Sequence, residues 1–79
     1  MNTEKVLEIV LAHGRLQADP STITDTTDLY AAGLSSLTTV HLMLALEDAF
    51  DVEFPDELLS RRTFESVLSI AEAIDELVN

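Results

Sequence analysis

The stretch GLSSLTTVHLMLALEDAF, residues 33–50, decides how this chain folds. From residue 36 to residue 50 its apolar side chains recur at helical spacing, and its Leu, Ala, Met and Glu residues all favour helices. Ser35 stands where a serine hydroxyl can accept one of the unpaired backbone N–H groups of a helix. Gly33 interrupts regular structure just before it. The stretch therefore predicts a helix over residues 36–50 with Ser35 as its N-cap.

Two further helices are predicted on either side of this one. Residues 3–17 contain no proline and carry apolar side chains about three and a half residues apart. The last helix is expected to begin near Thr63 or Phe64 and to run to Val78, because one apolar stripe there lies opposite a row of acidic residues. That stripe consists of Phe64, Val67, Leu68, Ala71, Ile74 and Val78.

The segments between the helices are predicted to be irregular. Residues 18–35 are rich in turn and cap residues, and so long a loop is usually functional, since connections have a median of about 4–6 residues. Four apolar side chains of this loop are expected to pack it against the rest of the domain: Ile23, Leu29, Tyr30 and Leu34. Residues 56–59 can form one short helical turn after Pro55. We therefore expect an all-α bundle of three main helices and one short helix, as a single domain over residues 1–79.

Length and composition limit what the chain can do. Its 79 residues, 47% of them hydrophobic, suit one small folded domain. A domain of this size buries only about 60% of the surface of its unfolded chain, so it has little room for a deep active site. The absence of cysteine excludes disulfides, thiolate zinc sites and a thiol nucleophile of its own. No signal peptide and no run of 18 apolar residues is found, and we expect a cytoplasmic protein.

Acidic residues dominate the charge. Fifteen Asp and Glu against four Lys and Arg give a net charge of −11, and no Lys or Arg lies between Arg15 and Arg61. Such a surface repels nucleic acids and anionic membranes, so neither is an expected partner. A basic protein surface is the expected partner. The alternative is an acidic face that only keeps the chain soluble.

The number and spacing of glycines and histidines exclude most known catalytic and metal-binding motifs. Because Gly14 and Gly33 are the only glycines, no glycine-rich phosphate loop can be written. The run GLSSL (33–37) begins like the nucleophile turn of a hydrolase, but it lacks the second glycine and a preceding strand. His13 and His41 lie on different predicted helices, which favours two surface histidines over a metal site. We therefore predict no catalytic residue and no metal site.

Ser36 occupies a position where a negatively charged group would be stabilised. It follows the long loop and opens the predicted helix over residues 36–50, and helix N-termini attract anions through their unpaired N–H groups and their dipole. A phosphodiester on Ser36 would be well placed. The alternative is that Ser36 only caps the helix. Because Ser35 can also cap it, one of the two serines is left over.

The predicted central helix has two apolar faces. One face is expected to pack into the core through Leu42, Met43, Leu46, Ala49 and Phe50. Leu37, Val40 and Leu44 form a second stripe that runs back to Ser36. An exposed apolar strip beside carboxylates is typical of a docking helix. The alternative is that a three-helix core uses both stripes.

Three segments, in this order and spacing, resemble the acyl carrier protein superfamily. They are DLYAAGLSSL (28–37), ALEDAFDVEFPDELL (45–59) and TFESV (63–67). The resemblance covers nearly the whole chain and implies a small four-helix bundle. It also implies that Ser36 is esterified with 4′-phosphopantetheine from coenzyme A by a separate, magnesium-dependent transferase. The thiol of that arm would carry acyl or aminoacyl groups as thioesters, so the chain itself would not be an enzyme.

Two positions depart from the fatty-acid carriers of this superfamily. Those carriers have Asp before the serine and an acidic residue five positions after it, where this chain has Ser35 and His41. The difference implies partners other than the fatty-acid enzymes. The runs YAAGLSSL and EDAFDVEFPDELL are most similar to stand-alone bacterial aminoacyl carrier proteins, which are loaded by ligases homologous to seryl-tRNA synthetase.

The resemblance also implies partners and a surface that they read. The partners are a phosphopantetheinyl transferase, an amino acid or acyl ligase and a downstream acyl or aminoacyl transferase, and the carrier is expected to be a monomer. The expected partner surface comprises Ser35, Leu37, Val40, His41, Leu44, Glu47 and Asp48. One alternative is a fatty-acid or polyketide carrier, which shares every feature except the two departures. The other is an unmodified acidic adaptor in which Ser36 is an ordinary cap.

Overall fold

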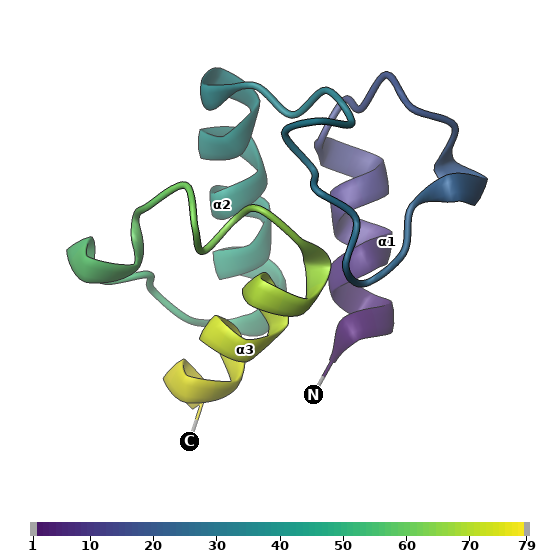
Figure 1. The fold of residues 1–79 in the computed structure, drawn as a ribbon. Coiled ribbons are helices and arrows are strands. Elements are labelled where there is room, and N and C mark those ends of the chain that lie inside the picture. Colours follow the sequence, from purple (N-terminus) through teal and green to yellow (C-terminus); the bar gives the residue numbers. More distant parts are fainter. Residues whose placement is uncertain (1, 79) are drawn as a thin grey trace.

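The computed structural model describes residues 2–78, and within them the chain is helical without strands. The elements are α1 (Thr3–His13), the 3₁₀ turn η1 (Pro20–Thr22), α2 (Ser36–Phe50), the 3₁₀ turn η2 (Asp56–Leu58) and α3 (Val67–Val78) (Figure 1). The all-α prediction is confirmed. The predicted short helix after Pro55 is only the single 3₁₀ turn η2, so the described residues contain three α-helices.

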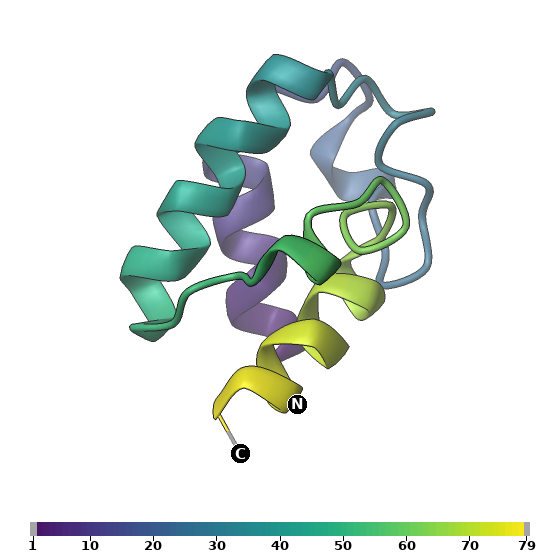
Figure 2. The ribbon, with the colours of Figure 1, turned by 90° about the vertical axis from the view of Figure 1, so that its left-hand side faces the viewer.

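The helices α1 and α2 pack side by side and run in opposite directions, while α3 crosses them at one end (Figure 1). Two long loops complete the fold: the first loop (residues 14–35) and the second loop (residues 51–66). Both lie on the same side of α2 (Figure 2). The first loop ends at residue 35, so Ser36 at the start of α2 directly follows this loop.

The bounds of α2 agree with the prediction from sequence. Ser35 has extended backbone, and its hydroxyl oxygen accepts a hydrogen bond from the N–H of Thr38 at 3.1 Å. At the other end Asp51 adopts a left-handed conformation (φ 54°), and its N–H donates to the carbonyl of Glu47. Both ends of α2 are thus fixed by local hydrogen bonds that satisfy otherwise unpaired backbone groups.

The helix α1 is shorter than predicted, because it ends at His13 and not at residue 17. Gly14 donates its N–H to the carbonyl of Val10, and Arg15 then turns the chain away with a left-handed φ of 51°. The N–H of Gln17 bonds to the carbonyl of Ala32 at 2.9 Å instead of continuing the helix. The end of the predicted helix is therefore paired with the end of the first loop.

The helix α3 also begins later than predicted, at Val67 and not at Thr63 or Phe64. The hydroxyl of Ser66 accepts a hydrogen bond from the N–H of Ser69 at 3.1 Å and so acts as an N-cap. Phe64 is buried as predicted, but it belongs to the second loop. The predicted stripe is otherwise correct for Val67, Ala71 and Ile74, which are buried. It is wrong for Val78, which is 55% exposed, and only partly correct for Leu68, which is half-buried. Ile70 and Ala73 complete the buried face of α3.

The core is formed by the helices together with the first loop. Three of the four loop residues expected to pack inward, Ile23, Leu29 and Leu34, are at most 6% exposed, and Tyr30 is half-buried. The first loop is also tied to the start of α3, since Leu29 donates its N–H to the carbonyl of Glu65 at 2.7 Å. Buried apolar side chains and hydrogen bonds thus fix a loop that has little regular structure. No helix within residues 2–78 is long and apolar enough to cross a membrane.

Candidate functional site

The two serines at the start of α2 have different roles. The hydroxyl of Ser35 bonds to the N–H of Thr38 and lies 2.7 Å from its Oγ1, so it is occupied by capping. Ser36 is exposed, and its hydroxyl makes no hydrogen bond to any residue among 2–78. The prediction that Ser35 caps the helix is confirmed. The serine left over is Ser36, which points into solvent at the positive end of the helix dipole.

The first loop approaches Ser36 through a conformation that requires glycine. Gly33 has a φ of 119°, and a Cβ atom there would lie 2.8 Å from the backbone nitrogen of Gln17. One residue later Leu34 is buried, and its N–H donates to the carbonyl of Leu29 at 2.9 Å. A side chain at position 33 would therefore be strained and would press against the backbone. Ser36 is held by a packed loop and not by a freely moving one.

A pocket of about 310 Å³ opens beside Ser36, between α2 and the second loop. Its apolar lining comes from Val40 and Met43 on α2 and from Leu59 and Phe64 on the second loop. Arg61 also lines the pocket, and its guanidinium carbon lies 4.1 Å from the centre of the Tyr30 ring. A group attached to Ser36 would thus have both an apolar wall and a cation within the same pocket.

The outer face of α2 carries the second apolar stripe. Leu37, Val40 and Leu44, which we name the outer strip, are 73%, 50% and 55% exposed. Leu42 and Leu46 on the opposite face are fully buried. The division into two faces is thus confirmed for these five leucine and valine residues, and the alternative of a core that uses both stripes is wrong. In the predicted core face, Ala49 is exposed, and Met43 and Phe50 are half-buried.

The polar residues of the expected partner surface fall into two kinds. His41 and Asp48 are exposed. Glu47 is half-buried, and its carboxylate accepts a hydrogen bond from the N–H of Phe54 at 2.8 Å. That bond ties the end of α2 to the second loop. Glu47 therefore has a structural contact of its own beside any contact with a partner.

Some features of the site have no clear signal in the sequence. The contact between Arg61 and Tyr30 joins two loops, and the sequence marks Arg61 only as the first Lys or Arg after Arg15. Among residues 2–78 no group of three His, Cys, Asp or Glu side chains could hold a metal ion. The distinctive chemistry of the pocket at this end of the molecule therefore rests on an exposed serine, apolar side chains and one arginine.

Residues 4–74 match the model of a protein family described as the phosphopantetheine attachment site. The chain belongs to this family. Its members are carrier proteins, which hold 4′-phosphopantetheine covalently and are not enzymes. The expected cofactor and the expected carrier role are thus confirmed. An unmodified acidic adaptor does not fit this membership.

Known carrier proteins are similar to this family member in sequence. It is 49% identical over 69 residues to an aminoacyl carrier protein of Agrobacterium fabrum, an alignment that covers 87% of this chain and 83% of the relative. It is 40% identical over 55 residues to an acyl carrier protein of Caulobacter vibrioides, which covers 68% of each chain. The resemblance to aminoacyl carrier proteins is confirmed.

The fold of this family member is also similar to those of carrier proteins in solved complexes. The carrier protein of Agrobacterium tumefaciens, crystallised with an engineered Bradyrhizobium japonicum glycine:[carrier protein] ligase and ATP, matches with a TM-score of 0.88 and 45% identity over 95% of this chain and 97% of that one. A glycylated carrier protein in complex with the Bradyrhizobium japonicum ligase matches with a TM-score of 0.70 and 29% identity, over 89% and 97%.

Proposed function

We propose that Ser36 is the residue that carries 4′-phosphopantetheine. The observation that carries this proposal is the different roles of the two serines, since Ser35 caps α2 and the exposed Ser36 hydroxyl has no hydrogen bond to any residue from 2 to 78. A transferase removes the proton of that hydroxyl, because the hydroxyl is bonded to no residue among 2–78 that could act as its base. The Ser36 oxygen then attacks the phosphorus atom next to pantetheine in coenzyme A, and the other phosphate leaves with the nucleotide. The attached arm supplies the thiol that forms thioesters.

We propose that the cargo is an amino acid, with glycine as the first candidate. The support comes from relatives, since solved carrier proteins at 45% and 29% identity are bound to a glycine:[carrier protein] ligase. In this chain Ser35 and His41 stand where fatty-acid carriers have acidic residues, which favours a different ligase. A fatty-acid or polyketide cargo is the second candidate, because the Caulobacter vibrioides acyl carrier protein is also a relative.

The proposed partner surface is the outer strip together with Ser35, His41, Glu47 and Asp48. The phosphopantetheinyl transferase, the ligase and a downstream acyl or aminoacyl transferase would each bind this surface. Its aliphatic side chains would pack against the partner, and its acidic side chains would attract basic groups on the partner. We also propose that the carrier is a monomer and that it acts in the cytoplasm, the compartment that supplies these enzymes with coenzyme A and ATP. We also propose that η2 and the rest of the second loop take the place of the short helix in four-helix carrier bundles.

Intact mass spectrometry tests the attachment site. The protein is incubated with coenzyme A, magnesium and a broad-specificity phosphopantetheinyl transferase, and Ser36→Ala and Ser35→Ala are treated in the same way. We expect the wild type and Ser35→Ala to gain one phosphopantetheine and Ser36→Ala to gain none. Ser36→Ala should change the free energy of unfolding by at most about 0.5–1 kcal/mol, because the cap remains. Full loading of Ser36→Ala would refute the assignment.

The same samples then identify the cargo. The modified wild type is incubated with ATP and either a glycine:[carrier protein] ligase with glycine or an acyl ligase with a fatty acid. We expect a gain of one glycyl group that hydroxylamine removes, as it removes any thioester. A gain only from the acyl ligase would replace the first cargo candidate with the second and would leave the attachment site unaffected.

A further inference from the structure

The few cations of this chain are placed unevenly. Lys5 lies with its Nζ 5.2 Å from the centre of the Phe50 ring, at the far end of α2 from Ser36. Arg61 lines the pocket that contains Ser36, and Arg15 lines a separate hollow with Leu37, Thr38 and His41 on another side of the first turns of α2. Two of the four basic residues thus lie beside the start of α2 in a chain with 15 acidic ones.

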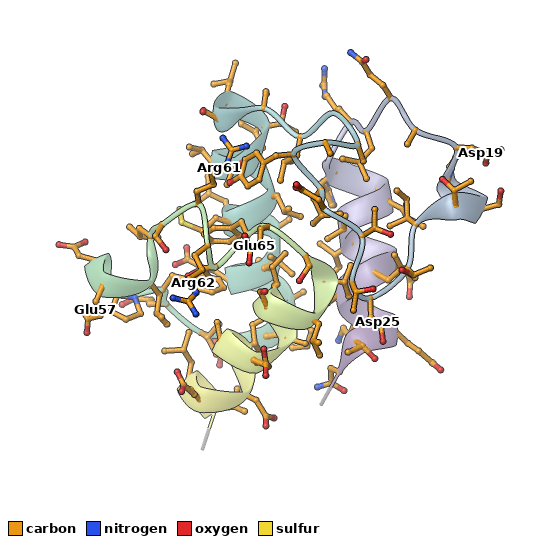
Figure 3. The ribbon with its side chains drawn as sticks, viewed as in Figure 1. Asp19, Asp25, Glu57, Arg61, Arg62 and Glu65 are labelled. Atoms are coloured by element: carbon orange, nitrogen blue, oxygen red, sulfur yellow. The ribbon has the colours of Figure 1, made fainter. Side chains whose placement is uncertain are left out.

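Arg61 and Arg62 are adjacent in sequence but differ in their surroundings. Arg62 lines a hollow together with three carboxylates, those of Glu57, Glu72 and Glu76. The pocket at Arg61 has no carboxylate in its lining, and Arg61 forms no ion pair with any residue from 2 to 78. Figure 3 shows the two side chains apart, with Arg61 beside the upper part of α2 and Arg62 lower, on the side of Glu57. Arg61 is therefore a cation without an anion of its own.

The Tyr30 ring holds the Arg61 side chain in place. A guanidinium carbon 4.1 Å from the ring centre is within the range of a cation–π contact. The Tyr30 hydroxyl in turn lies 3.5 Å from Oγ1 of Thr39, one turn along α2 from Ser36. The ring thus restrains an arginine that would otherwise move freely, which lowers the entropy lost when it binds an anion.

We propose that Arg61 is the intramolecular counter-ion of the phosphodiester on Ser36. The proposal rests on the proposed function, because it requires that phosphodiester. A guanidinium presents a planar fork of N–H donors that matches two phosphate oxygens, and the N-terminus of α2 favours the same anion. Tyr30 belongs to the first loop and Arg61 to the second, so attachment at Ser36 joins both loops to the start of α2.

Thermal unfolding of modified and unmodified protein tests this proposal. The melting temperatures of both forms are measured at low ionic strength for the wild type, Arg61→Gln and Arg62→Gln, after mass spectrometry shows complete modification. Both substitutions remove one positive charge, which makes Arg62→Gln the matched control. We expect the change in Tm on modification to be about 2–4 °C more favourable in the wild type than in Arg61→Gln, the size of one exposed charge pair in a domain of this length. Arg62→Gln should behave as the wild type does.

A second measurement does not depend on unfolding. In NMR spectra the side-chain Nε–H signal of Arg61 should move on modification, while that of Arg62 should stay. Tyr30→Phe should retain the effect of modification on Tm, and Tyr30→Leu should reduce it, because only the former keeps the ring. Equal effects of modification in wild type, Arg61→Gln and Arg62→Gln would overturn the proposal. Failure of the transferase to modify the wild type would instead refute the proposed function.

Discussion

The helices α2 and α3 begin with the same local device and put it to different uses. At each start a serine hydroxyl accepts the N–H of the residue three positions later at 3.1 Å, and it also pairs with that residue's hydroxyl, as Ser35 does with Thr38 and Ser66 with Ser69. The next residue differs. In α3 it is Val67, which is fully buried, and in α2 it is the exposed Ser36.

The two starts also differ in what lies in front of them. The start of α3 is covered by the first loop, since the N–H of Leu68 bonds to the carbonyl of Asp25, and Leu29 bonds to Glu65. The start of α2 faces solvent and a pocket. A serine cap therefore does not mark a functional site by itself. What distinguishes α2 is that its first residue takes no part in packing.

Exchanging these first residues should have the largest effect. Val67→Ser removes buried apolar surface and leaves a hydroxyl in the core, so we expect a loss of about 2–4 kcal/mol in the free energy of unfolding. Ser36→Val should change it by less than about 0.5 kcal/mol, because the site is exposed, and should abolish loading. Chemical denaturation and intact mass measure the two effects.

The control for this exchange is Val67→Ile, which keeps the position apolar. A Ser36→Val protein as unstable as Val67→Ser would contradict the view that the start of α2 is outside the packed core. A Val67→Ser protein as stable as Ser36→Val would also contradict it, because Val67 would then contribute no more to the core than the exposed Ser36.

Removing the two caps should have a smaller effect. We expect Ser66→Ala to cost about 1–2 kcal/mol and Ser35→Ala about 0.5–1 kcal/mol of unfolding free energy. The reason for the order is access of water, since Ser66 is 8% exposed, whereas Ser35 is exposed. Water can therefore replace the lost hydroxyl at Thr38 more readily than at Ser69. Urea denaturation with Ser→Thr variants as controls measures this order, and equal or reversed losses would disprove it.

Salt should have the smallest effect and should act on the whole molecule. A net charge of −11 on 79 residues destabilises the compact state by self-repulsion, which salt screens. We expect the melting temperature to rise by a few degrees between low and high ionic strength. The loss caused by Val67→Ser should stay the same, because that contact is apolar and buried. A melting temperature that does not change with salt would show that the acidic residues are far enough apart to be harmless.

The sequence predicted α2 correctly because the signals at both of its ends are local. It misplaced the other helix ends where distant parts of the chain decide them. Leu16 extends the apolar spacing of α1, but the bond from Gln17 to Ala32 depends on the path of the first loop. Phe64 is in phase with the stripe of α3, yet it is buried from within the second loop.

The candidate site shows the same division. Two adjacent serines before an apolar stripe were enough to predict that one caps and the other is left over. The contact of Arg61 with Tyr30 and the bond from Phe54 to Glu47 join residues of different elements, and neither pattern is visible along the chain. Local capping chemistry is readable from residues three apart, whereas contacts between loops require the fold.

The exposure of the outer strip has a consequence for evolution and for engineering. Because at least half of Leu37, Val40 and Leu44 remains exposed when the chain folds, we expect their replacement to change stability less than replacement of a core residue, while it alters the surface that we propose partner enzymes contact. Affinity for a new ligase can therefore arise by single substitutions that natural selection need not compensate in the core. Glu47 marks the limit of this freedom, since its carboxylate is bonded to Phe54. A carrier orthogonal to the natural enzymes would be designed on the strip and would leave Glu47 unchanged.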